Sequence, residues 1–118
     1  MINKLKELPA LITKQRTHLL ELQNDLEENI SSISNWESKV KQDIADETDA
    51  KGKAVFSNAE KRQVELDRRK SEDELISQYV DNVKILKFKI DNLRIEMQFN
   101  IDTQENLRAI ARLGGDLN

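Results

Sequence analysis

The chain has no cysteine, and its 118 residues include only one proline, three glycines and one histidine. Without cysteine it forms neither disulfides nor thiolate metal sites, and a reducing cytosol is the default compartment. So few glycines and prolines leave few turns, which argues against a β-rich fold and favours long helices or coiled coil. The composition therefore predicts an all-α protein.

Long apolar runs and an excess of one charge are also missing. No stretch approaches the roughly 20 apolar residues of a membrane span, and Met1 to Leu11 lacks the continuous apolar core of a signal peptide. We therefore expect a soluble, unprocessed, cytoplasmic protein with no membrane partner. The 22 acidic and 19 basic residues are interspersed and give a net charge of −3, so no broad field attracts nucleic acid.

Apolar residues recur at heptad spacing through the first half of the chain. With Leu5 at position a, every a position to residue 40 is apolar, while the d positions alternate between apolar and polar. This pattern predicts a helix over about residues 4–46. The polar d positions Gln15 and Asn29 either fix the register through a polar partner or lie at the margin of the seam beside solvent. The a positions are Leu5, Ile12, Leu19, Leu26, Ile33 and Val40.

The second half carries a cleaner seam, which turns polar at Asn100 and Gln104. Residues 47–56 supply turn chemistry, and Ser57 with Glu60 forms a capping box, so we expect one continuous helix over about residues 57–113. Because this helix is strongly charged in its first half, we expect loose packing near the turn. The seam consists of Ile76, Tyr79, Val83, Leu86, Ile90, Leu93 and Met97.

Short connections join antiparallel neighbours, so the two helices predict a long antiparallel helical hairpin of the coiled-coil type. The hairpin forms a single unit over residues 1–118. Its register places Leu5 opposite the region of Met97, and the turns from Phe99 onward overhang without an intrachain partner.

A second apolar stripe follows the face of the second helix that points away from its seam. One partner helix cannot cover both faces, and exposed apolar patches usually mark interfaces. We therefore expect self-association into a dimer or a higher helical bundle. The predicted oligomer interface combines this stripe with two residues of the overhang: Ile85, Phe88, Ile95, Phe99, Leu107 and Ile110.

No pattern in the sequence favours catalysis. His18 lies off the seam, and neither a cysteine nor a cluster of carboxylates lies at helical spacing around it. An EF-hand aligned on Gly52 would put Lys51 at a ligand position, so the acidic turn fails as a calcium loop. Gly52 and Lys53 also lack the remainder of a phosphate-binding loop. We predict a protein that is not an enzyme and that binds no cofactor or metal.

A basic segment leaves nucleic-acid binding as an alternative function. Acidic residues surround its cations, so we favour a solvated face of i,i+4 ion pairs over a phosphate-binding surface. If Arg69 reaches across to Trp36, its guanidinium can stack on the ring. The possible nucleic-acid contacts are Lys61, Arg62, Arg68, Arg69 and Lys70.

The run "GKAVFSNAEKRQVELDRR", beginning at Gly52, resembles the middle of small uncharacterised coiled-coil proteins of bacterial and prophage genomes. The resemblance covers about twenty residues; it implies a coiled coil and no particular activity. The expected function is therefore a non-enzymatic protein–protein interaction or oligomerisation module, such as an assembly or scaffold factor. Besides nucleic-acid association, a chaperone for a secreted or phage structural protein is the remaining alternative.

Overall fold

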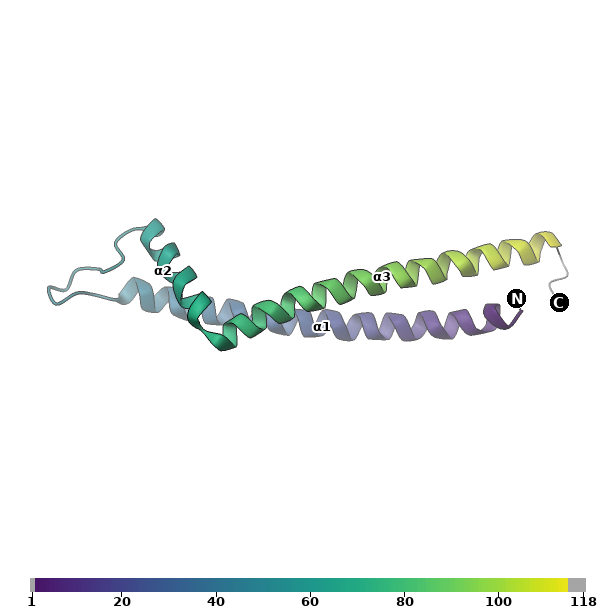
Figure 1. Cartoon of the computed structure of the whole chain (residues 1–118), viewed down its shortest axis with the longest axis horizontal. Helices are drawn as coiled ribbons and strands as arrows, with labels where there is room; N and C mark the ends of the chain where they lie inside the picture. Colours follow the sequence, from purple (N-terminus) through teal and green to yellow (C-terminus); the bar gives the residue numbers. More distant parts are fainter. Residues whose placement is uncertain (1, 115–118) are drawn as a thin grey trace. The chain divides into compact units, whose positions relative to one another are not determined.

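The computed structural model consists of three helices and describes residues 2–114, with side chains from residue 5 onward (Figure 1). Helix α1 spans Ile2–Asp46, α2 spans Ala59–Glu72 and α3 spans Glu74–Gly114. Within the described residues, β-type pairing is limited to a single bridge between Thr48 and Ala54. The prediction of an all-α protein is confirmed, and the first helix ends at the expected residue.

The segment between α1 and α2 is held by its own hydrogen bonds. The Asp49 Oδ1 atom accepts from the backbone N–H of Lys51 at 2.8 Å and of Lys53 at 3.0 Å. Gly52 has a φ of 79°, a left-handed conformation that suits glycine. The Val55 N–H donates to the Glu47 carbonyl at 3.0 Å and closes the loop. The predicted turn is therefore an ordered loop that ends two residues later than expected.

Asn58, and not Ser57, caps the start of α2. Its Oδ1 atom accepts from the Lys61 N–H at 2.8 Å. Asn and Ser are similarly good N-cap residues, so local preference alone does not choose between them. With the cap at residue 58, Glu60 falls one position too early to reach back to the cap N–H, so the predicted capping box is wrong.

The predicted continuous helix over residues 57–113 is also wrong, because it breaks at Asp73. Asp73 has an extended backbone, with φ −84° and ψ 111°. Its Oδ1 atom accepts from the Ile76 N–H at 3.0 Å, while its own N–H donates to the Arg69 carbonyl at 3.1 Å. One aspartate thus pairs a backbone N–H at the start of α3 and a backbone carbonyl at the end of α2, which stabilises the break.

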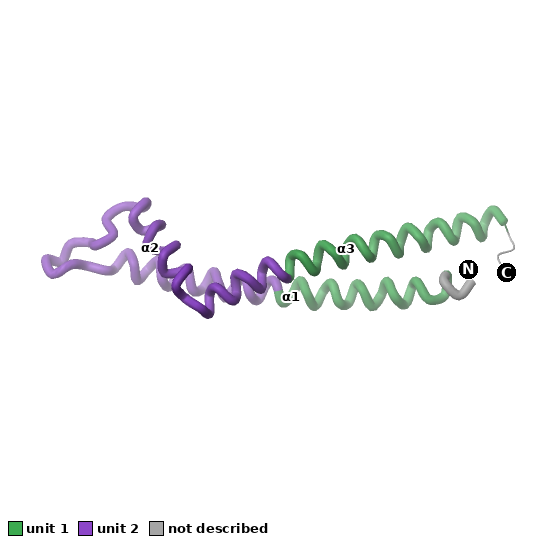
Figure 2. Tube along the Cα trace, viewed as in Figure 1, with its two compact units in different colours: residues 1–25, 86–118 green, residues 26–85 purple. Residues whose placement is uncertain are grey.

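The chain divides into two compact units, coloured separately in Figure 2. Unit 1 comprises Met1–Asp25 and Leu86–Asn118, and unit 2 comprises Leu26–Ile85. Helices α1 and α3 each contribute residues to both units, whereas α2 belongs to unit 2 alone.

The core of unit 1 joins the two predicted seams. The α1 and α3 segments run side by side in opposite directions (Figure 2). Every buried side chain of this unit occupies a predicted seam position, which confirms both patterns here. Among the polar positions, Asn100 Nδ2 donates to Gln15 Oε1 at 3.1 Å in a partly buried bond. The buried residues are Leu8, Ile12, Leu22, Ile90, Leu93 and Met97.

The pairing of Gln15 with Asn100 corrects the predicted register. In an antiparallel pair, moving ten residues back from Gln15 to Leu5 means moving ten residues forward from Asn100, which reaches Ile110. Leu5 is therefore level with Ile110 and not with Met97, and Leu107 is half-buried instead of overhanging. The prediction failed because it counted outward from a short turn and an unbroken helix, whereas the chain has a longer loop and a break at Asp73.

Unit 2 has a small core where loose packing was expected. Ile44, Leu66 and Ile76 are its buried apolar side chains, and Ile44 and Ile76 are the most completely buried large residues among the described ones. Two ion pairs cross from α2 to other segments: Lys70 Nζ lies 2.6 Å from Glu37 Oε1, and an Arg69 nitrogen lies 2.9 Å from Glu47 Oε2. Leu66 is the buried residue of the charged helix α2, and it packs there together with these two ion pairs.

Candidate functional site

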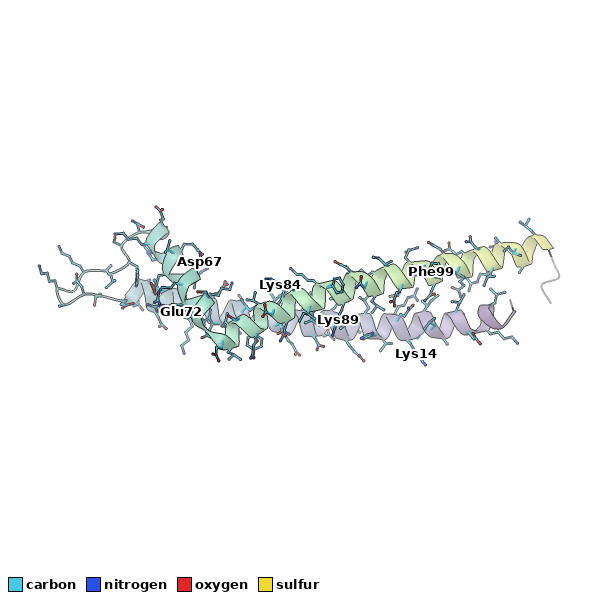
Figure 3. All side chains as sticks on the ribbon, in the orientation of Figure 1. Lys14, Asp67, Glu72, Lys84, Lys89 and Phe99 are labelled. Atoms are coloured by element: carbon cyan, nitrogen blue, oxygen red, sulfur yellow. The ribbon has the colours of Figure 1, made fainter. Side chains whose placement is uncertain are left out.

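The outer face of α3 in unit 1 carries a row of exposed apolar side chains. Phe88 and Ile95 are each 68% exposed and Phe99 is 70% exposed, and all three point away from the buried seam of Ile90 and Met97. Figure 3 labels Phe99 on α3. We call Phe88, Ile95 and Phe99, together with Asn92 between them, the outer stripe. Three large side chains in water at this spacing form a patch of the kind that marks an interface.

The other predicted interface residues differ in position. Ile85 belongs to unit 2 and is 51% exposed, and Ile110 is exposed in unit 1. Leu107 is half-buried and shares the seam face with Met97, so its side chain packs within the chain. The predicted overhang at Leu107 is wrong because the register differs, whereas its place in an oligomer interface stays a prediction.

An open groove of about 550 Å³ lies beside the stripe. Ile95 and Phe99 from α3 and Leu11 from α1 provide its apolar lining, and Glu96 provides a carboxylate. The sequence did not point to Leu11, because this residue precedes the seam residue Ile12 and occupies neither an a nor a d position. Only the pairing of α1 with α3 brings Leu11 next to the stripe.

Three of the five cations in the basic segment are paired with carboxylates. Arg68 contacts Glu65 and lies 2.7 Å from Glu72. Arg69 bonds Glu65 and Glu47, each at 2.9 Å, and Lys70 bonds Glu37. Lys61 and Arg62 are exposed on α2. The segment therefore presents a partly neutralised surface, as the solvated-face interpretation predicted.

Glu65 is the centre of this charge cluster. Hydrogen bonds from the Arg68 and Arg69 guanidinium groups lower the pKa of its carboxyl to about 2. The same bonds raise the pKa of both arginines above the ordinary value. Burial of Glu65 opposes its shift, yet the two cations dominate. Glu65 is thus a charged structural link and has no property of a general acid at neutral pH.

Arg69 lies over Phe56, whereas the sequence had suggested that it could stack on Trp36. Its Cζ atom is 5.9 Å from the centre of the Phe56 ring, within the range of a cation–π contact. Phe56 is half-buried, whereas Val55 and Val64 beside it are exposed and line a second open groove with it. Nothing in the sequence indicated the path of the loop that brings Phe56 to Arg69.

The acidic turn and the histidine do not converge on a site. Asp49 accepts two backbone bonds of the loop, and Glu47 binds Arg69, so both carboxylates have structural partners. His18 is exposed on α1. Among the described residues there is no group of three or more His, Cys, Asp or Glu side chains that could hold a metal ion.

No described helix combines the length and the apolar content needed to cross a membrane. Comparison with known proteins gave no match to any protein-family model, curated protein or solved structure.

Proposed function

We propose that the chain is a cytoplasmic, non-enzymatic coiled-coil module, folded as an antiparallel helical hairpin, that oligomerises through the outer stripe. As an assembly or scaffold factor it would work by helix packing. The observation that carries the proposal is the alignment of Phe88, Ile95 and Phe99 on one face of α3, each about two-thirds exposed. Burying this face in a dimer or a higher bundle removes its apolar surface from water.

The energetic reason is the hydrophobic effect. Each Å² of apolar surface that leaves water contributes roughly 25 cal/mol, and a phenylalanine carries a large area for burial. Polar substitutions at these positions would leave the buried seam of the chain unchanged, so folding alone does not require aromatic residues here. Association gives them a role.

The charge pattern supports a protein partner over nucleic acid. Phosphate binding needs free cations, and Arg68, Arg69 and Lys70 are all engaged by carboxylates of the same chain. The net charge of −3 adds repulsion. We expect no DNA or RNA binding at moderate salt; tight binding at that salt with a steep salt dependence would favour the nucleic-acid alternative.

Sedimentation equilibrium of the wild-type chain and Phe88→Glu tests the proposal. We expect the wild type to be a dimer or larger at tens of micromolar and Phe88→Glu to shift towards monomer, because a carboxylate is costly to bury in an apolar contact. The matched control is Leu20→Glu, since Leu20 is 58% exposed in unit 1 but lies on α1. A monomeric wild type, or equal effects of the two substitutions, would contradict the proposal.

A further inference from the structure

The outer stripe has the spacing of a coiled-coil seam. Phe88, Asn92, Ile95 and Phe99 follow one another at intervals of four, three and four residues, which corresponds to positions d, a, d and a of a heptad. Asn92, the one polar member, lies in the middle. A seam of this kind packs against another helix with the same spacing, and the outer stripe of a second copy provides one.

Charged side chains flank this seam asymmetrically. Lys89 and Glu96 each follow a d position and therefore lie on one flank, at position e. Asp91 and Gln98 each precede an a position and lie on the opposite flank, at position g. All four are exposed, and neither Lys89, Asp91 nor Glu96 forms an ion pair with another described residue. Residues at e and g select the partner and the orientation of coiled coils.

The groove beside the stripe suits an aromatic ring with a cation next to it. Its apolar lining, from Leu11, Ile95 and Phe99, suits an aromatic ring, and Glu96 at its edge suits a cation next to that ring. Phe88 on the stripe and Lys89 on the flank that also carries Glu96 supply this combination. The surface is thus complementary to itself, which is the requirement for a two-fold symmetric contact.

We propose that two copies pair through α3 in antiparallel orientation, with Phe88 of each copy against Phe99 of the other. This inference rests on the proposed function and adds the partner, the register and the direction. The two-fold axis passes between residues 93 and 94. Asn92 then packs beside Ile95 of the second copy, and the two Asn92 side chains meet near the axis, where each can bond the other. Lys89 faces Glu96 of the second copy, and symmetry repeats this ion pair.

The parallel arrangement places like charges together. In a parallel pair, a g residue faces the e residue five positions later in the other helix. Asp91 would then oppose Glu96 of the second copy on both sides of the seam. In the antiparallel pair, e positions face e positions of the second copy and g positions face g positions. Lys89 therefore meets Glu96, while Asp91 meets the neutral Gln98. Charge complementarity therefore selects the antiparallel dimer.

Charge reversal distinguishes the two orientations. In the antiparallel dimer, Lys89→Glu or Glu96→Lys alone creates two repulsive pairs, so each should weaken dimerisation about five- to tenfold, and the double reversal should restore it. In a parallel dimer, Glu96→Lys would instead strengthen association, because it removes the repulsion from Asp91. Lys87→Glu is the control, since it makes the same charge change at an exposed position outside the two flanks. Sedimentation equilibrium measures all of these variants.

A distance measurement provides a second readout, made simple by the absence of native cysteine. A nitroxide label on Glu105→Cys should lie about 35 Å from its symmetry mate along the antiparallel pair, given a helical rise of about 1.5 Å per residue. Labels much closer together, or strengthening by Glu96→Lys, would overturn the antiparallel register while leaving self-association intact. A wild-type chain that stays monomeric would instead reject the proposed function itself.

Discussion

Removal of the Ile44 side chain should destabilise unit 2 by about 3 kcal/mol. Ile44 is only 1% exposed, and alanine lacks three of its carbon atoms. At about 0.8 kcal/mol for each buried methylene, the lost transfer free energy is about 2.4 kcal/mol, and the cavity left behind adds to it. Leu66 and Ile76 complete this small core, so few neighbours can move in to fill the space.

Ile30→Ala is the matched control for Ile44→Ala. It makes the same chemical change in the same helix and unit, but Ile30 is 45% exposed. The higher helix propensity of alanine offsets part of its smaller burial loss, so we expect a cost below about 1 kcal/mol. Urea unfolding followed by the fluorescence of Trp36, the only tryptophan and a member of unit 2, measures both at one protein concentration. Equal losses from the two variants would refute the core assignment.

Three further predictions concern polar groups. Asp73→Ala should cost about 1 kcal/mol in urea unfolding, because it removes the cap on the Ile76 N–H, whereas Asp73→Asn should retain most of the stability. A double-mutant cycle of Gln15→Ala and Asn100→Ala should give a coupling of about 0.5–1.5 kcal/mol; additive losses would mean that their bond contributes nothing. The lowered pKa of Glu65 contributes stability above the ordinary value of 4.5 that is lost as pH falls towards about 2. Acid unfolding monitored by circular dichroism should therefore be shallower over this range for Glu65→Gln than for the wild type.

Heptad spacing predicted the helices and their buried faces well. Ile90, Leu93 and Met97 are buried as expected, and the aromatic residues of the outer stripe are exposed. Periodicity succeeds here because a long helix repeats one geometric rule over many turns, so a few polar interruptions do not hide the pattern. The polar interruption at Gln15 also indicates the register, because Gln15 accepts a hydrogen bond from Asn100 of the paired helix.

Features that depend on a single residue were missed. The break at Asp73 follows from one carboxylate capping α3, within a charged run that also suits a helix surface. The choice of Asn58 over Ser57 as the cap follows from small differences between similar residues. The register error followed from these local errors, because a hairpin register is counted outward from its turn. The groove that includes Leu11 depended on the register and could not have been found without it.

The difference between α1 and α3 in unit 1 explains why association should use α3. Leu11 and Leu20 are exposed on α1, but they are nine residues apart, which is two and a half turns, so they lie on opposite sides of that helix. No second helix could cover both. On α3, Phe88 and Phe99 are eleven residues apart, close to three full turns, and lie on one side. Scattered apolar residues are ordinary on a protein surface, whereas aligned ones can be buried together by one partner, so only α3 offers a continuous seam to a second copy.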